Sequence, residues 1–418
     1  MMPPISVAPT RRGVIAGAGA VFAWSQLPRP ARADGHDPRF VAIVLRGALD
    51  GLAVVAPVGD PHWRDLRGAD ALTLEGETPG LRLEGFFALS PAMPNLHEFY
   101  RHGHATLVHA VATPYRDRSH FDGQDVLQTG AVEPGALDTG WLNRTMPSLA
   151  PERSPDPHAR EALAIGPVTP LIMRGPAPVL SWEAQKLPPA SDETTLRLIE
   201  LYHHTDPVFA RVMEERIGLG AIAHAGGIDQ ANANNSPAIQ PGGIAQVRAY
   251  FVEAAGSAAK FLARDDGPRI GALAFDGWDT HVNEGPVKGR LTLLLTALDD
   301  ALAAMAANMG EAWRETVVVA ITEFGRTAHM NGNGGTDHGT ATVAFLVGGA
   351  LNGGRVIADW PGLAGSDLYQ GRDLKPTTDL RAVMKGVLRD HLRVTEAALS
   401  TSVFPDSAAV RPVPDLVA

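Results

Sequence analysis

The sequence predicts a doubly wound α/β fold, in which a mostly parallel sheet carries helices on both faces. Short apolar runs without alternation are typical of strands that are buried on both faces. Five such runs span 39–45, 106–111, 270–275, 316–322 and 342–347. Helical segments separate several of them, and strands that alternate with helices favour a parallel sheet. The chain has 418 residues, 45% of them hydrophobic, which is enough for a large core.

The remaining elements are predicted from periodicity and from helix-start and helix-stop residues. Predicted helices span 95–101, 120–128, 193–204, 207–218, 244–263, 286–308 and 377–391. A further strand is predicted at 161–165. The segment of about 131–243 is otherwise rich in Pro, Gly and Asn, so we expect an irregular insert there. The mature chain, 34–418, is predicted to form one domain around this insert.

The first 33 residues are predicted to be an export signal. Arg11 and Arg12 precede an apolar run over 14–24, and a small-residue cleavage pattern ends at Ala33. The apolar run is too short to span a bilayer. The pattern is that of twin-arginine export, which carries proteins already folded; the alternative is an ordinary secretory or anchoring segment. We expect cleavage after Ala33, a periplasmic or secreted product that the twin-arginine machinery exports, and no membrane span in the mature chain.

Composition excludes several classes of function. The formal net charge is −10 and no long Lys/Arg run occurs, so a nucleic-acid partner is not expected. The chain has no cysteine, which excludes disulfides, thiolate metal ligands and cysteine nucleophiles.

Polar residues follow the predicted strands at positions that suit a ligand site. In open α/β sheets, ligands bind beyond the carboxyl ends of the strands. The polar residues just past these strands are Asp50, Ser119, Asp279, His281, Glu323, Asp337 and His338. We expect them to converge at one edge of the sheet.

These residue types suit divalent metal ions. Imidazole and carboxylate groups are ligands for Zn or Mn, and carboxylates alone suit Mg or Ca. Asp279 and His281 are two apart, so in an extended chain both side chains can hold one ion. The predicted ligands, enough for two ions, are Asp50, Asp279, His281, Glu323, Asp337 and His338. Each of these residues could instead have a structural role, as a turn residue or a helix cap.

Ser119 opens a predicted helix and is either its N-cap or a nucleophile. His120 is equally compatible with a core and a site role, and with Arg118 it completes the candidate catalytic group. Three further arginines near the motifs are expected to bind an anionic substrate: Arg46, Arg116 and Arg326.

The motifs LRGALDGL, RDRSHFDGQDVLQTG, GWDTH, TEFGRT and GTDHG occur in this order. Together they resemble an uncharacterised bacterial family of twin-arginine-exported proteins, the domain of unknown function fifteen hundred and one. That family is placed among the alkaline phosphatase and sulfatase-like proteins. The likeness covers nearly all of the mature chain.

The resemblance implies a two-metal hydrolase with an alkaline-phosphatase-like fold. It matches Asp50 to the ligand after the first strand, Ser119 to the nucleophile and His338 to the final histidine. Asp279 and His281 are similar to the Asp and His that bind one ion. At the strand end where the superfamily has an Asp-His pair, this chain has Glu323 and Phe324, so one imidazole is missing.

The favoured hypothesis is a periplasmic metal-dependent hydrolase of a small or polymeric phosphate ester, mono- or diester. A non-catalytic exported binding or assembly protein that retains the fold is the alternative, because fold does not imply function. Sulfatase activity is disfavoured, since the residues after Ser119 lack the Pro and Arg of the sulfatase signature.

Overall fold

The computed structural model describes residues 37–149, 162–166, 168–183, 202, 211, 244–285 and 287–418. The strands of its main sheet are β1 (Arg39–Arg46), β5 (Ala105–Ala112), β6 (Ala162–Ile165), β7 (Leu180–Trp182), β8 (Ile270–Asp276), β9 (Thr316–Ile321), β10 (Thr342–Val347), β11 (Arg355–Ile357) and β12 (Thr378–Asp379). The α-helices longer than five residues in the described part of the chain are α4 (Pro94–Arg101), α5 (His120–Thr129), α9 (Ile244–Leu262), α10 (Arg290–Met309) and α11 (Leu380–Asp390).

The predicted mostly parallel sheet is confirmed. The strand order is β11-β5-β10-β9-β1-β8-β6-β7, with β12 on the end of β5. β1 pairs in parallel with both β8 and β9, and β6 pairs in parallel with β7 and β8. Among the described strands of this sheet, only β10 runs antiparallel to its neighbours, β9 and β5. Strands β6 and β7 belong to the sheet although they fall in the predicted irregular insert.

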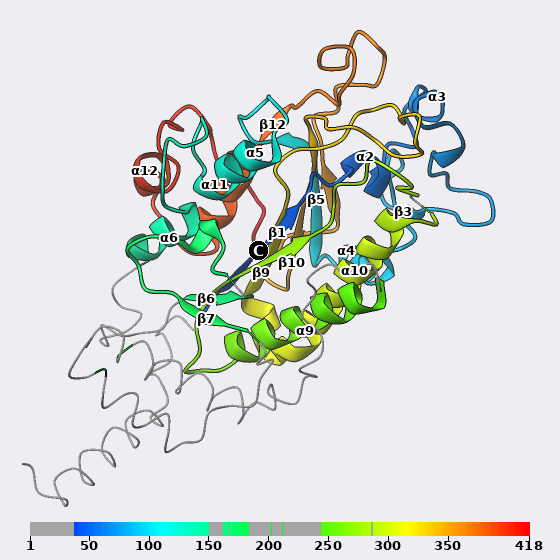
Figure 1. Cartoon of the computed structure of the whole chain (residues 1–418). Helices are drawn as coiled ribbons and strands as arrows, with labels where there is room; N and C mark the ends of the chain where they lie inside the picture. Colours follow the sequence, from blue (N-terminus) through cyan, green and yellow to red (C-terminus); the bar gives the residue numbers. More distant parts are fainter. Residues whose placement is uncertain are drawn as a thin grey trace, which may run out of the picture.

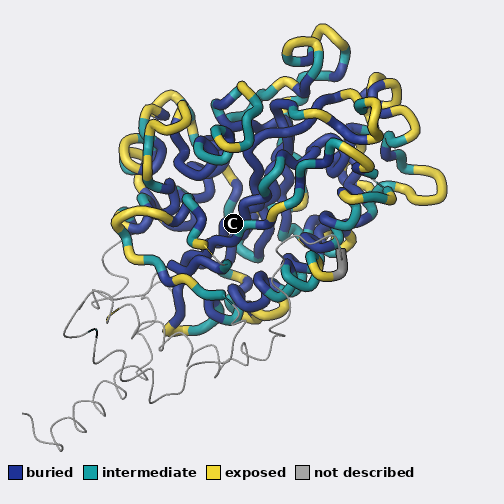
Figure 2. Tube along the Cα trace, in the orientation of Figure 1, coloured by how far each residue is buried: buried dark blue, intermediate teal, exposed yellow. Residues whose placement is uncertain are grey.

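Alternating residues of β1 explain why helices cover both faces (Figure 1). Val41, Ile43 and Leu45 pack into the core cluster that includes α9 and α10. The intervening Phe40 and Val44 pack into a second cluster that includes α11 and the short helix α6 (Trp141–Thr145). Figure 2 shows the resulting buried interior along the sheet. A strand that is apolar on both faces requires such a two-sided cover.

Several elements were not predicted because they are too short for periodicity. A three-stranded sheet is formed by β2 (Val55–Ala56), β4 (Ala88–Leu89) and β3 (Leu81–Arg82). Helix α2 (Gly51–Val54) lies between β1 and β2 in the sequence, and helix α3 (Trp63–Arg67) lies between β2 and β3. The predicted helices at 193–204 and 207–218 and the predicted signal at 1–33 lie, except for residues 202 and 211, outside the described residues.

Helix α10 joins the two halves of one helical layer. It packs against α9 and α4. The fully buried Asp299 of α10 accepts hydrogen bonds from the Leu96 N–H at 2.7 Å and the Asn95 N–H at 3.0 Å, and so caps the start of α4. Together with the turn that follows it, Arg290–Glu315, α10 is long and apolar enough to span a membrane by length and composition, but half of its most apolar window is buried within the molecule.

The topology brings several strand ends to one edge of the sheet. Arg46 at the end of β1 lies beside Asp276 at the end of β8, and β9 ends on the other side of β1. Because β10 is antiparallel, its first residue, Thr342, lies at this edge, next to Val111 near the end of β5. The loops after β5, β8 and β9 and the loop before β10 therefore meet at one place.

Candidate metal site

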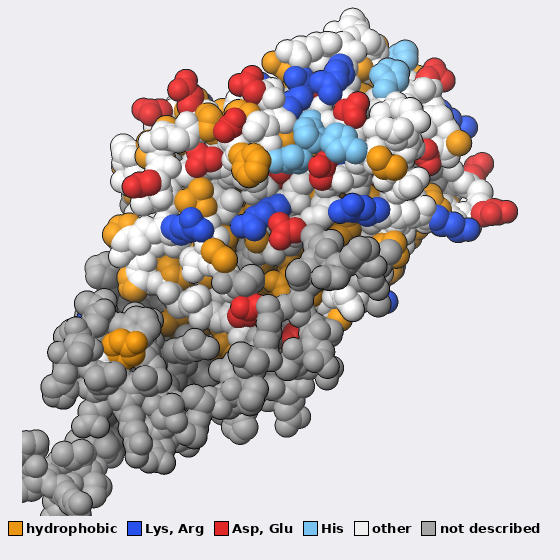
Figure 3. All heavy atoms as spheres, viewed as in Figure 1, with side chains coloured by type: hydrophobic (Ala, Val, Ile, Leu, Met, Phe, Trp, Pro, Cys, Tyr) orange, Lys and Arg blue, Asp and Glu red, His pale blue; other side chains and the backbone are white. Residues whose placement is uncertain are grey.

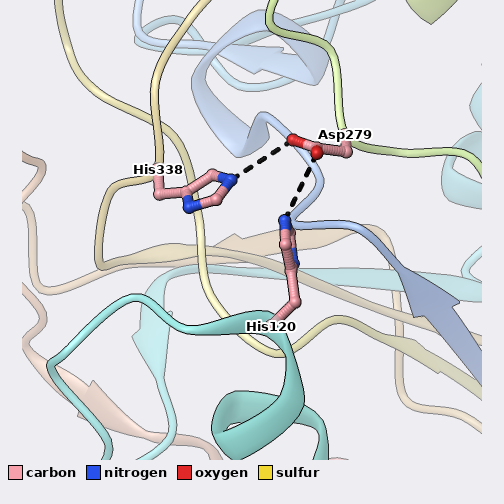
Figure 4. Close-up of side chains that lie close together, drawn as sticks. All are labelled: His120, Asp279 and His338. Atoms are coloured by element: carbon pink, nitrogen blue, oxygen red, sulfur yellow. Dashed lines mark hydrogen bonds and ion pairs between the residues drawn. The ribbon is translucent and has the colours of Figure 1, made fainter.

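Three of the converging loops contribute one group of side chains that could hold a metal ion. His120 is the first residue of α5, Asp279 follows β8, and His338 precedes β10. Their nearest ligand atoms all lie within 4.8 Å of one another. Asp279 lies between the two imidazoles, with Oδ2 at 3.5 Å from His120 Nε2 and Oδ1 at 3.3 Å from His338 Nε2 (Figure 4).

A third imidazole adjoins this group. His281 Nε2 is 3.1 Å from Asp279 Oδ1 and 2.9 Å from His338 Nε2. On its other side, His281 Nδ1 is 3.2 Å from Asp337 Oδ1. The sequence prediction that these four residues share one site is consistent with this geometry. Figure 3 shows histidine side chains gathered on this face, with acidic and basic side chains around them.

Glu323 fixes the orientation of the His120 ring. The Glu323 carboxylate is fully buried and accepts a hydrogen bond from His120 Nδ1 at 2.8 Å. The Gly47 N–H donates to the same oxygen at 2.9 Å, and the Thr322 hydroxyl donates to the other at 2.8 Å. Burial alone would raise the pKa of Glu323, but these hydrogen bonds, led by that from His120, hold it below its ordinary value. The bond to Glu323 correspondingly raises the pKa of His120, against the opposing effect of burial.

All three imidazoles present Nε2 to Asp279 at the centre of the site. Nδ1 of His120, His281 and His338 faces an oxygen acceptor. These acceptors are Glu323 Oε1, Asp337 Oδ1 and the main-chain oxygen of Arg118. A carboxylate or carbonyl oxygen can only accept, so Nδ1 carries a hydrogen in each ring; when the ring is neutral, Nε2 then carries the lone pair. Three lone pairs thus converge beside a carboxylate.

This arrangement fits a divalent cation. Two ligands about 2.0–2.1 Å from a tetrahedral ion lie roughly 3.3–3.4 Å apart, close to the 3.3 Å and 3.5 Å separations around Asp279. His120 Nε2 is buried and has no hydrogen-bond partner among the described residues. The Nε2 atoms of His281 and His338 are 2.9 Å apart, so their lone pairs would repel each other without a shared proton or cation. An ion would satisfy all of these atoms.

Two glycines allow the loops to approach this closely. Gly47 has φ +122°, and a Cβ there would lie 2.5 Å from the backbone nitrogen of Asp279. Gly123, on the first turn of α5, faces Glu323 and Phe324, and a Cβ would lie 3.0 Å from the Phe324 ring. Larger residues would separate β1 from Asp279 and α5 from Glu323.

Phe324 forms an apolar wall at the position where the resemblance implies a histidine. It is 2% exposed and stacks on His120 with ring centroids 5.1 Å apart. It also lies 5.3 Å from His338. Phe324 cannot ligate an ion, but His120 supplies an imidazole to the site from another loop.

The structure does not bring Asp50 into the metal-binding group. Asp50 is fully buried, and the Arg67 guanidinium donates to both of its oxygens, at 2.5 Å and 3.0 Å. It also accepts from the N–H groups of Leu52 and Ala53 as the N-cap of α2. Burial opposes ionisation, but the Arg67 charge holds the pKa of Asp50 below its ordinary value. Its carboxylate is therefore occupied by a structural ion pair.

Glu284, which was not predicted, is buried beside this pair. Burial raises the pKa of Glu284 to about 8, and the nearby Asp50 charge adds to the effect. Its Oε2 accepts from the Thr336 hydroxyl at 2.9 Å, and Thr336 in turn accepts from Arg326 Nε at 3.1 Å. A buried hydrogen-bonded chain thus connects Glu284 to the arginine that contacts Asp279.

Stability should fall as the pH rises from about 4.5 to about 8, because folded Glu284 holds its proton more tightly than the unfolded chain does. One such group changes the free energy of unfolding by up to about 1.4 kcal/mol per pH unit. Asp50 titrates below this window, since its pKa is lowered. Glu284→Gln, which resembles the neutral acid, should match the wild type in urea unfolding at pH 5 and exceed it at pH 8. An equal pH slope in both proteins would contradict this.

Ser119 occupies the predicted N-cap position of α5, but its side chain makes no capping hydrogen bond. Its N–H donates to the Tyr115 hydroxyl at 3.1 Å. Arg118 was predicted to belong to the catalytic group, but its side chain contacts other residues. Its guanidinium binds Asp373 and Gln370 instead, with Nε 2.8 Å from Asp373 Oδ2.

The predicted substrate arginines have three different environments. Arg116 Nη1 donates to the main-chain oxygens of Thr113 and Tyr115, which holds the guanidinium against its own loop. Arg46 is partly exposed at the site edge, and among the described residues its guanidinium forms an ion pair with Asp276 alone, at 3.7 Å. It remains available to a ligand.

Arg326 is buried within the site itself. Its Nη1 donates to Asp279 Oδ1 at 2.8 Å, and its Nη2 has no hydrogen-bond partner among the described residues. Burial opposes ionisation of Asp279, but the Arg326 hydrogen bond and charge keep the pKa of Asp279 below its ordinary value. The carboxylate that faces the three imidazoles is thus held ionised.

Sequence reasoning missed the residues that support the site from a distance. Arg67 lies in a short helix without periodicity, and Asp373 follows a loop that carries no motif. Glu284 carried a weak signal, since it follows the GWDTH motif by only a few residues.

Comparison with known proteins identifies a family but no activity. A family model described as "Protein of unknown function (DUF1501)" matches residues 103–403. The search of curated proteins found no match.

Solved structures with a similar arrangement are distant. The PsFucS1 sulfatase from Pseudoalteromonas sp. is 10% identical, with a TM-score of 0.39, covering 96% of this chain and 76% of that chain. The phosphonate monoester hydrolase of Agrobacterium radiobacter is 12% identical, with a TM-score of 0.33 and coverages of 85% and 74%. Ps i-CgsB, solved with a neocarrahexaose, is 10% identical, with a TM-score of 0.43 and coverages of 90% and 77%. These likenesses are too distant to assign an activity.

Proposed function

We propose that this chain, which belongs to the DUF1501 family of proteins of unknown function, is an exported metal-dependent hydrolase of phosphate esters. One observation carries the proposal: three imidazoles, each with Nδ1 held by an oxygen acceptor, direct Nε2 toward Asp279. Ligating histidines in metalloenzymes are held in this way, by an acceptor that fixes the tautomer.

The ligands proposed for the ion are His120, His281, His338 and Asp279, and nitrogen with carboxylate oxygen suits Zn or Mn better than Mg or Ca. The described residues gather one group of this kind, so we propose one ion at this group. Asp337 and Glu323 orient two of its imidazoles. When bound, a divalent ion polarises a phosphoryl oxygen and stabilises the negative charge of the transition state.

An anionic substrate is supported by the cations around the group. Arg46 is partly exposed, and the buried Arg326 Nη2 has no hydrogen-bond partner within the described part of the chain. Both are guanidinium groups, which match the oxygens of a phosphate. Ser119, beside His120, is the proposed nucleophile: its oxygen would lose its proton to solvent and attack phosphorus, and the ester oxygen would take up a proton and leave as the alcohol. Water would then attack the phosphoserine, break its O–P bond and release phosphate.

Metal content and turnover test this proposal together. Elemental analysis of the exported protein should find close to one Zn or Mn per chain, and His338→Ala should lose it. The protein should hydrolyse chromogenic phosphate esters, and chelation should stop turnover until metal is restored. Bound metal without turnover on any phosphate or sulfate ester would favour the non-catalytic binding protein. No bound metal would overturn the proposal, and turnover of sulfate esters alone would make it a sulfatase.

Export through the twin-arginine route is proposed from Arg11 and Arg12. Replacing both with Lys should leave the precursor in the cytoplasm, whereas the wild type should begin at Asp34 after cleavage. Cell fractionation and N-terminal sequencing check both points. Normal export of the double variant would indicate another secretion route.

A further inference from the structure

The Arg118 backbone adopts a conformation that is unfavourable for a residue with a side chain. Its φ is +63°, in the left-handed region. In this conformation, the Arg118 main-chain oxygen accepts a hydrogen bond from His338 Nδ1 at 3.1 Å. That contact gives His338 the tautomer whose Nε2 lone pair faces Asp279. The orientation of a metal-binding imidazole thus depends on one strained peptide unit.

Asp373 holds the side chain of the same residue. It is fully buried, and its Oδ2 accepts from Arg118 Nε at 2.8 Å and lies 2.7 Å from Arg118 Nη2. The Thr340 hydroxyl, two residues after His338, donates to the same oxygen at 2.7 Å. One carboxylate therefore joins the loop before α5 to the loop that carries His338.

The neighbouring residue adds a second contact with His338. Arg372 Nη2 donates to the His338 main-chain oxygen at 2.7 Å. His338 also forms a β-bridge with Arg326, and Asp373 forms one with Thr327. The three chain segments around His338 are therefore tied together, and Asp373 and Arg118 are the charged pair at their junction.

We propose that the Arg118–Asp373 ion pair is a positioning clamp for His338. It keeps Arg118 in the left-handed conformation, so that the Arg118 carbonyl fixes the His338 tautomer and leaves Nε2 free for the ion. Arg118 and Asp373 act through His338 and do not contact the ion or the substrate. This inference rests on the proposed metal-dependent function, but it concerns residues outside the ligand set.

Cobalt binding to the purified full-length protein tests the clamp directly. Co²⁺ reports its ligands through visible absorption, and titration gives its affinity without any need for turnover. Asp373→Asn and Arg118→Ala should each weaken Co²⁺ binding by about 10- to 100-fold, the usual effect of losing a group that orients a ligand. Both should change the absorption spectrum, because His338 would no longer present a fixed Nε2.

Arg118→Gly separates backbone conformation from side-chain charge. Glycine adopts positive φ at no steric cost, so this variant should keep more affinity than Arg118→Ala. Asp299→Asn is the matched control: Asp299 is also a buried carboxylate, but it caps α4. It should lower thermal stability and leave Co²⁺ affinity and spectrum unchanged. All titrations are made well below each variant's melting temperature.

The outcomes separate this inference from the proposed function. If the wild type binds no Co²⁺, Zn²⁺ or Mn²⁺, both the proposed metal site and the proposed clamp are overturned. If the wild type binds and Asp373→Asn binds equally well with the same spectrum, the clamp alone is overturned. Equal losses in Arg118→Gly and Arg118→Ala would also overturn it, because the backbone conformation would then not matter. If Asp373→Asn does not fold, the comparison of glycine with alanine still decides.

Discussion

Replacing Glu323 by alanine should weaken metal binding about 10- to 100-fold and lower turnover at least as much. Without this carboxylate, His120 loses the acceptor that holds its Nδ1 hydrogen, so its ring can rotate or adopt the other tautomer. The Gly47 N–H and the Thr322 hydroxyl also lose their acceptor. Each buried group left unsatisfied costs roughly 1–3 kcal/mol. Metal titration and urea unfolding measure the two effects separately.

Glu323→Gln is the informative companion, because its amide oxygen can still accept from His120. It should retain more metal affinity than the alanine variant. Asp299→Ala serves as the control for removing a buried carboxylate, since it should reduce stability without changing metal affinity. Metal affinity unchanged in Glu323→Ala would show that His120 is not oriented by this residue, and would remove the main support for His120 as a ligand.

The fold could be predicted because its strands are buried on both faces. The residues of β1 and β9 are almost all apolar, and such runs have few other structural explanations. The antiparallel direction of β10 could not be predicted, because its composition resembles that of its parallel neighbours. Strand direction depends on how the connecting loops run, and the sequence pattern contains no signal for that.

The site could be predicted only in part, because ligand geometry depends on contacts between distant residues. His120 was undecided between core and site, and its role becomes visible only through Glu323, 203 residues away. Asp50 has the position expected of a ligand, but Arg67, within an unpredicted short helix, occupies its carboxylate. Position after a strand selects candidates, whereas the partners of each side chain decide their roles.

Ser119→Ala should reduce turnover by at least about 10³-fold if Ser119 is the nucleophile, since the oxygen that forms the covalent intermediate is then removed. Stability should change by less than about 0.5 kcal/mol, because the Ser119 side chain makes no capping hydrogen bond that would be lost. Metal affinity should stay within about two-fold, since the proposed ligands are unchanged. Steady-state kinetics, urea unfolding and metal titration measure these three quantities on one variant.

The covalent intermediate gives an independent test of the same role. Acid quench of the wild type during turnover should trap a phosphoserine at Ser119, which mass spectrometry would locate and which Ser119→Ala would lack. Ser119→Thr is the control that retains a hydroxyl, so it should retain part of the turnover that alanine loses. Near-normal turnover in Ser119→Ala would exclude the serine and make water the attacking group. His120 and Asp279 would then be the residues positioned to orient that water, because both face the same centre.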